Sequence, residues 1–167
     1  VLDSKFQLYQ YAEVLDEINQ LVDDGLFSGK DEARIRYIKA YSLYKLNNTK
    51  ESLSNFSWLV DHTEGALRAE SFYYSALLLY NNKKYNDSQE TIFNLINELP
   101  GYHVWVQKSL LLLSKNYLHK EDLFQAQHVL IELEKQCKDP DILNEIKQIR
   151  QVNFPVLKDS IVIIQND

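Results

Sequence analysis

Residue types that carry chemistry in other proteins are scarce in this chain of 167 residues. A single cysteine, Cys137, excludes an internal disulfide. Four glycines and three prolines are too few for a flexible linker, a low-complexity segment or a glycine-rich phosphate-binding loop. Methionine is absent, so we expect the sequence, which starts at Val1, to begin inside a longer precursor. No apolar run approaches the roughly 20 residues of a membrane helix, which predicts a chain without a membrane span.

Catalytic and metal-binding patterns are missing as well. The histidines stand far apart in the sequence, at His62, His103, His119 and His128, and no pair has the spacing of two metal ligands on one helix. Cys137 has no neighbouring histidine to activate its thiol, so we expect a structural cysteine. The sequence therefore predicts a protein without a catalytic centre, a metal site or a cofactor.

The charge balance is acidic, with a net charge of −6 at pH 7 and a pI near 5.2. Lysines and arginines are scattered along the chain and form no basic cluster, which argues against nucleic acid as the partner. Acidic residues gather near the N-terminus, at Asp16, Glu17, Asp23, Asp24, Asp31 and Glu32. This region fits an ordinary solvated surface, and it also fits an acidic patch that attracts a basic partner.

The stretch Ala69–Pro100 predicts two helices joined by a tight turn. Apolar residues recur at helical spacing in its first half, and a second amphipathic run begins at Tyr85. Residues 81–84 separate the two runs, because asparagine side chains compete with the helix for backbone hydrogen bonds. One helical hairpin cannot bury both of its apolar faces, so this stretch predicts neighbours of the same kind.

Pairs of small residues repeat along the chain at matching positions. The two members of each pair lie 12 positions apart, and the pattern advances by 36 and then by 38 positions. The pairs are Ala40 with Ser52, Ala76 with Ser88, and Ser114 with Ala126. Two helices joined by a short turn can cross closely only where the side chain at the contact is small. We therefore expect these residues to be buried between paired helices.

The central stretch resembles the tetratricopeptide repeat (TPR) family. That family sets a bulky residue, a small residue, a tyrosine at the start of the second helix, another small residue and a closing proline in a fixed order. The residues that match it are Phe72, Ala76, Leu79, Tyr85, Ser88, Ile92, Leu95 and Pro100. The flanking stretches depart from it, because Thr49 and Leu123 replace the tyrosine and Glu64 replaces the proline. The resemblance covers roughly residues 33–140.

The resemblance implies an all-α fold, a right-handed α-α solenoid of about three TPR-like hairpins. We expect a repeat domain over residues 1–151, with hairpins at about 33–66, 69–102 and 103–138. An apolar stripe predicts one flanking helix from Lys5 to Val22.

A capping helix over 139–151 and a separate tail over 152–167 complete the expected organisation. Asp139-Pro140 is a helix-start signal, and the apolar residues that share one side of the following helix are Ile142, Leu143, Ile146 and Ile149. In the tail, Ile161–Ile164 is β-branched and apolar. We expect this segment to pack on its own solenoid, on a neighbouring copy or on a region outside the sequence.

By resemblance, the first helix of each hairpin lines the concave side of the solenoid and supplies a candidate partner-binding surface. Its residues are Arg34, Tyr37, Tyr41, Tyr44, Lys45, Tyr73, Leu77, Tyr80, Lys108, Leu111 and Lys115. Tyrosine combines a large contact area with a polar tip, which suits a peptide or a partner helix. In the alternative, the tyrosines pack against the adjacent helix as part of the core. The Lys/Asn clamp with which some TPR proteins hold a C-terminal carboxylate is not reproduced, so that ligand is not expected.

The pattern favours a non-catalytic interaction scaffold that binds a protein or peptide partner on its concave face. Two alternatives stay open: a homo-oligomerisation module that uses the tail 152–167, and an accessory domain of a larger enzyme or envelope complex. The last repeat, Leu118–Gln136, resembles those of bacterial cell-envelope TPR proteins. That resemblance implies a periplasmic or envelope-associated location ahead of a cytoplasmic one.

Overall fold

The computed structural model describes residues 2–23 and 31–154 of the chain, and within these residues it has nine helices and no strand. The helices are α1 (Leu2–Gln7), α2 (Tyr11–Asp23), α3 (Glu32–Lys45), α4 (Thr49–His62), α5 (Gly65–Asn81), α6 (Tyr85–Glu98), α7 (His103–His119), α8 (Leu123–Gln136) and α9 (Pro140–Asn153). The predicted all-α fold is confirmed. None of these described helices combines the length and the apolar character that a membrane crossing requires.

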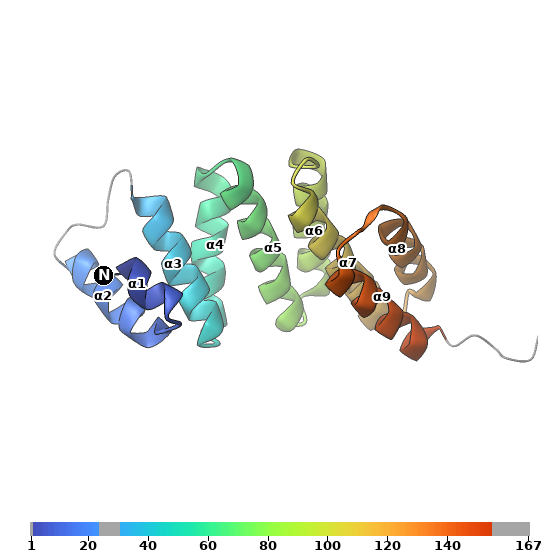
Figure 1. Cartoon of the computed structure of the whole chain (residues 1–167), viewed down its shortest axis with the longest axis horizontal. Helices are drawn as coiled ribbons and strands as arrows, with labels where there is room; N and C mark the ends of the chain where they lie inside the picture. The colour runs from blue at the N-terminus through green and yellow to red at the C-terminus, as the bar shows by residue number, and fades with distance from the viewer. Residues whose placement is uncertain (1, 24–30, 155–167) are drawn as a thin grey trace, which may run out of the picture.

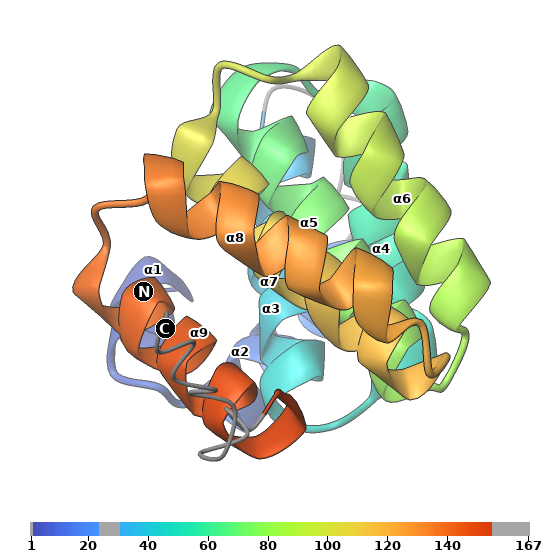
Figure 2. The same ribbon diagram turned by 90° about the vertical axis from the view of Figure 1, so that its right-hand side faces the viewer.

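The helices follow one another along the long axis of the molecule, from α1 and α2 at one end to α8 and α9 at the other (Figure 1). Each helix packs against its neighbour in sequence, and α5 also packs against α7, as α9 does against both α7 and α8. Viewed from the α8–α9 end, α4 and α6 lie to one side of α5 and α7, and α9 lies to the other (Figure 2). Alternate helices therefore occupy different sides of the stack.

Four turns within the described residues share one backbone conformation. Tyr9, Asn47, Lys83 and Glu121 have φ angles of 60° or 61°, in the left-handed region, and each lies two positions before the next helix begins. The amide of Asn47 donates to the Tyr44 carbonyl (3.1 Å) and that of Asn48 donates to the Leu43 carbonyl (2.9 Å). These are the two bonds of the Schellman motif, which ends a helix on a left-handed residue. The same pair of bonds recurs at the other three turns.

The first of these turns corrects a prediction. A single helix from Lys5 to Val22 is wrong, because the chain leaves α1 at Leu8 and starts α2 at Tyr11. The amides of Tyr9 and Gln10 donate to the carbonyls of Phe6 (3.1 Å) and Lys5 (3.0 Å) and close α1. No glycine, proline or asparagine marks this break, so the apolar stripe hides it. The pair α1–α2 thus repeats the turn of the later hairpins.

The expected close contacts between paired helices are present. All six repeating small residues are fully buried. Ser52 Oγ donates to the Ala40 carbonyl at 2.8 Å, and Ser88 Oγ donates to the Ala76 carbonyl at 2.9 Å, each across its own hairpin. In the third pair the hydroxyl stands on the other helix, and Ser114 Oγ donates to the Leu111 carbonyl of α7 itself (2.7 Å). The predicted burial of the small residues between paired helices is therefore confirmed.

The C-terminal helix begins as predicted and ends slightly later. Asp139 caps α9 by accepting the amides of Asp141 (2.9 Å) and Ile142 (3.2 Å), and Pro140 occupies the first helical turn. Ile142 and Ile146 are buried in a cluster with residues of α7 and α8, so α9 covers the end of the core. The helix runs to Asn153, two residues past the expected end. The expectation for the apolar segment Ile161–Ile164 lies outside the described residues.

Candidate functional site

Aromatic side chains from successive helices touch one another in a continuous cluster. The Tyr41 ring centroid lies 5.6 Å from that of Phe6 in α1 and 5.5 Å from that of Tyr74 in α5. Tyr74 in turn stacks on Phe56 of α4, with centroids 5.1 Å apart and an interplanar angle of 14°. Such contacts stabilise the packing between hairpins beyond the burial of area alone.

Three of the predicted tyrosines belong to this cluster. Tyr37, Tyr41 and Tyr44 are half-buried and pack against the core formed by Ala40, Phe56, Leu59 and Leu78. The Tyr37 hydroxyl donates to Glu70 Oε1 at 2.8 Å, which ties α3 to α5. Burial, followed by the Glu70 carboxylate, raises the pKa of Tyr37 well above its usual range. These side chains hold neighbouring hairpins together and expose only part of their surface.

The two predicted basic residues of the N-terminal half, Arg34 and Lys45, already have partners. Arg34 Nη2 lies 2.6 Å from the Asp3 carboxylate of α1. Lys45 Nζ lies over the rings of Tyr41 and Tyr44, at 5.3 Å and 5.6 Å from their centroids. Because these cations are engaged within the chain, this part of the predicted surface offers fewer open contacts.

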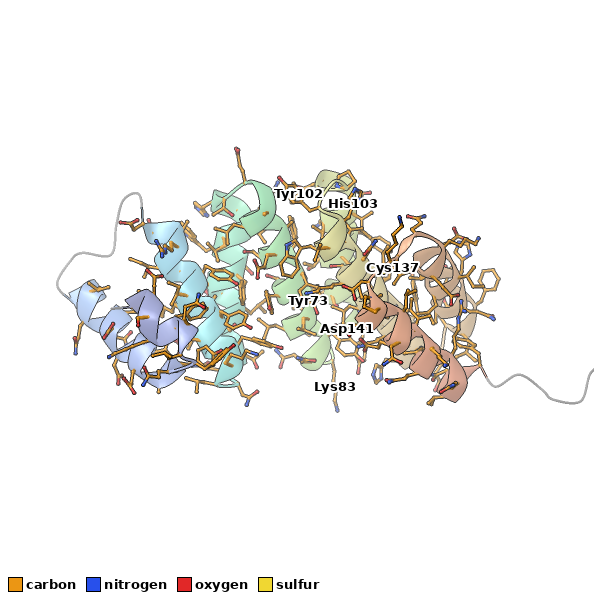
Figure 3. All side chains as sticks on the ribbon, in the orientation of Figure 1. Tyr73, Lys83, Tyr102, His103, Cys137 and Asp141 are labelled. Carbon is orange, nitrogen blue, oxygen red and sulfur yellow. The ribbon has the colours of Figure 1, made fainter. Side chains whose placement is uncertain are left out.

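Five of the predicted residues instead meet at a groove formed by three alternate helices. The groove has a volume of about 270 Å³ and lies between α5, α7 and the start of α9. Its lining residues are Tyr73, Leu77, Lys108, Leu111, Leu112, Lys115, Asp139, Asp141, Ile142 and Glu145. Tyr73 and Asp141 mark its α5 and α9 sides in Figure 3. Leu111, at 6% exposed, belongs to the floor and packs with the buried residues of α8 and α9.

The groove has one basic wall and one acidic wall. Lys108 and Lys115 come from α7, whereas Asp141 and Glu145 come from α9. Lys115 Nζ and Glu145 Oε1 form an ion pair at 2.5 Å that bridges the two walls. Within the described residues neither Lys108 nor Asp141 has an oppositely charged side chain in ion-pairing range. The Asp141 carboxylate is therefore available to a group of a bound partner.

The aromatic edge of the groove carries a cation. Lys108 Nζ lies 4.7 Å from the Trp105 ring centroid and 5.9 Å from that of Tyr73, and the two centroids are 5.6 Å apart. Burial raises the pKa of Tyr73 to about 12, so its hydroxyl remains a hydrogen-bond donor near neutral pH.

Tyr80 lies apart from the groove. Its ring contacts Tyr85 (5.6 Å) and His119 (5.4 Å), and His119 stacks on Tyr85 at 5.0 Å. Of the eleven predicted residues, five therefore line the groove, Tyr37, Tyr41 and Tyr44 belong to the aromatic cluster with Lys45 over two of their rings, and Arg34 and Tyr80 each make a separate contact.

Sequence reasoning missed four residues of this region: Tyr74, Trp105, Asp141 and Glu145. Tyr74 directly follows the predicted position Tyr73, and the TPR frame does not assign the residue after that position to the inner wall. Trp105 lies in the first turn of α7, which has no counterpart in the repeat pattern. Asp141 and Glu145 stand on α9, the predicted capping helix, which lies outside the three hairpins of the repeat frame. Extending that frame to α9 would predict that these two residues face the same side as Lys108 and Lys115.

The described residues contain no group of three or more His, Cys, Asp or Glu side chains that could hold a metal ion. The Cys137 thiol is buried and lies 3.5 Å from Gln107 Oε1. Comparisons with protein-family models, with curated proteins and with solved structures gave no match. The TPR resemblance therefore rests on the sequence residues that carry it.

Proposed function

We propose that this chain is a non-catalytic, TPR-like α-α solenoid that binds a peptide or a partner helix on the concave side lined by α3, α5, α7 and α9. The groove between α5, α7 and α9 is the observation that carries the proposal. An apolar floor with charges of both signs at the rim is typical of a site that fixes the register of a peptide.

The predicted tyrosines fall into a group that packs between hairpins and a group that reaches the groove, and this division also supports the proposal. Tyr37 and Tyr41 are held by contacts between hairpins, so they give the wall a fixed shape. Tyr73 and Leu77 reach the groove and would supply the contact area. A rigid wall lowers the entropy that is lost when a peptide binds.

The test is a selection from a random peptide library displayed on phage. The wild-type chain is compared with Leu77→Trp, which fills the groove, and with the matched variant Leu123→Trp, whose parent side chain is 51% exposed on α8. We expect the wild type and Leu123→Trp to enrich the same peptides, and Leu77→Trp to lose that enrichment. Thermal unfolding verifies that both variants fold.

Two outcomes would contradict the proposal. Enrichment of the same peptides by all three proteins would place binding outside the groove. Enrichment of no peptide by the wild type would remove peptide binding as the function.

A further inference from the structure

Lys108, Trp105 and Tyr73 form a cation site that the chain itself fills. An ammonium or guanidinium group within about 6 Å of a ring centroid is attracted by the negative face of the ring. Lys108 Nζ meets that condition for Trp105 and Tyr73 together, at 4.7 Å and 5.9 Å. We call these two rings the aromatic platform. The platform therefore already holds one organic cation.

Glu70 lies three residues before Tyr73 on α5, and its carboxylate interacts electrostatically with Lys108. Its carboxylate accepts the Tyr37 hydroxyl at 2.8 Å, and it makes no ion pair among the described residues. Burial raises the pKa of Glu70, while the Tyr37 hydrogen bond and the charge of Lys108 lower it. A half-buried carboxylate of this kind attracts a cation more strongly than a fully solvated one does.

The charges around the groove and the aromatic platform are unbalanced. Two ammonium groups, Lys108 and Lys115, line the groove with three carboxylates, Asp139, Asp141 and Glu145, and Glu70 is a fourth carboxylate that interacts with Lys108. One ammonium, that of Lys115, is already paired with Glu145. The excess of negative charge favours a positively charged occupant over a negatively charged one.

We propose that the aromatic platform, with Glu70 at its side, is a subsite for an arginine or lysine side chain of the peptide that fills the groove. Lys108 occupies this subsite in the free protein, and the cation of the partner replaces it. The inference rests on the proposed function, because the groove brings the peptide to the platform. It adds the chemical class of the partner: a segment with at least one basic residue.

The test uses acetyl-arginine amide as the probe and acetyl-citrulline amide as its neutral counterpart. Binding is followed through the indole N–H signals of a ¹⁵N-labelled sample, and a Trp58→Phe variant assigns the two signals. We expect the arginine compound to shift the Trp105 signal in a saturable way and the citrulline compound to leave it unchanged. Trp58 is the internal control, because Arg36 and the His62 ring already cover it, each 4.2 Å from its centroid.

Two variants separate the platform from general charge attraction. Lys108→Gln removes the internal competitor, so we expect it to tighten binding of acetyl-arginine amide about two- to fivefold. Glu70→Gln removes the negative charge and is expected to weaken binding by a similar factor. Lys135→Gln on α8, which lies outside the groove, is the control and should leave the affinity unchanged.

The results distinguish this inference from the proposed function. Equal shifts with the arginine and citrulline compounds, a Trp58 shift as large as that of Trp105, or no shift at all would overturn the cation subsite. If the enriched peptides contain no arginine or lysine, the result would support peptide binding in the groove and contradict the cation subsite. A saturable Trp105 shift without any enriched peptide would support the subsite and contradict peptide binding.

Discussion

Ser88 lies fully buried on α6, between its hairpin partner α5 and the following helix α7. Its hydroxyl donates to the Ala76 carbonyl (2.9 Å) and accepts a hydrogen bond from Asn116 Nδ2 (3.1 Å). One small polar side chain thus links three helices. A larger apolar residue would separate the helices and also leave the buried amide of Asn116 with one partner fewer.

Replacing Ser88 with leucine tests this arrangement. Overpacking costs about 1–3 kcal/mol, and a buried polar group that loses its partner costs about 1–3 kcal/mol. We expect Ser88→Leu to lower the free energy of unfolding by about 2 kcal/mol or more. The exposed Glu90→Leu on the same helix should change it by less than about 0.5 kcal/mol. Urea unfolding measures both, and equal midpoints would mean that the register of the small residues is wrong.

For single residues of the site, the sequence predicts which of them share a surface but not how exposed each one is. The repeat frame predicted that Tyr73, Leu77 and Lys108 share a surface, and they meet at one groove. It could not decide how exposed Tyr41 is, because that depends on Phe6 and Tyr74 from two other helices. Contacts between hairpins have no signature within any single stretch of the sequence.

Helices α5 and α7 each end in a turn where a residue other than glycine adopts the left-handed conformation. Lys83 and Glu121 occupy the left-handed region at φ angles of 61° and 60°. A residue with a Cβ loses roughly 1–2 kcal/mol in that conformation, whereas glycine adopts it freely. The hydrogen bonds of the Schellman motif impose this conformation on whichever residue follows the helix.

Lys83→Gly is therefore expected to stabilise the protein. Relief of strain outweighs the added entropy of the unfolded chain, so we expect a gain of about 0.5–1 kcal/mol. Lys84→Gly is the matched control, because Lys84 has a φ angle of −85° and bears no such strain, so this change should give no gain in stability. Thermal and urea unfolding record both changes. A loss of stability with Lys83→Gly would show that the backbone of Lys83 is not strained.

The elements themselves were predictable where breakers are present. The asparagines of residues 81–84, the Pro100-Gly101 pair and Asp139-Pro140 mark the ends of helices that the structure contains. The break between α1 and α2 has no such residue, since Leu8, Tyr9 and Gln10 are all tolerated in helices. The only sequence indication of this break is its position, because Tyr9 precedes the turn residue Asn47 by 38 residues, which is one repeat length.

The molecule as a whole is held together by contacts between neighbouring helices. Val14 and Ile18 of α2 form one buried cluster with α3, and Ile142 and Ile146 of α9 form another with α7 and α8 at the opposite end. No helix in the described residues packs against one far away in sequence. Stability in such an arrangement is close to a sum of local terms.

A cavity at one end of the molecule should therefore destabilise only the helices near that end. Ile146→Ala removes a fully buried side chain from α9, a change that typically costs about 2–5 kcal/mol. We expect amide hydrogen exchange to accelerate in α8 and α9 while α3 and α4 keep their protection. Ile18→Ala, equally buried on α2, should give the reverse pattern. Uniform acceleration throughout the molecule would mean that the chain unfolds as one cooperative unit.

The sequence by itself determined the helices from α3 to α9, the buried positions of Ala76 and Ser88, and the cap at Asp139, because each depends on local periodicity or on the chemistry of a few adjacent residues. Only the tertiary structure decided which side chains remain open. Lys115 meets Glu145, and Lys108 meets Trp105, across helices whose relative placement no local pattern encodes. Packing between α5, α7 and α9 sets those distances, and with them the groove where we expect a partner to bind.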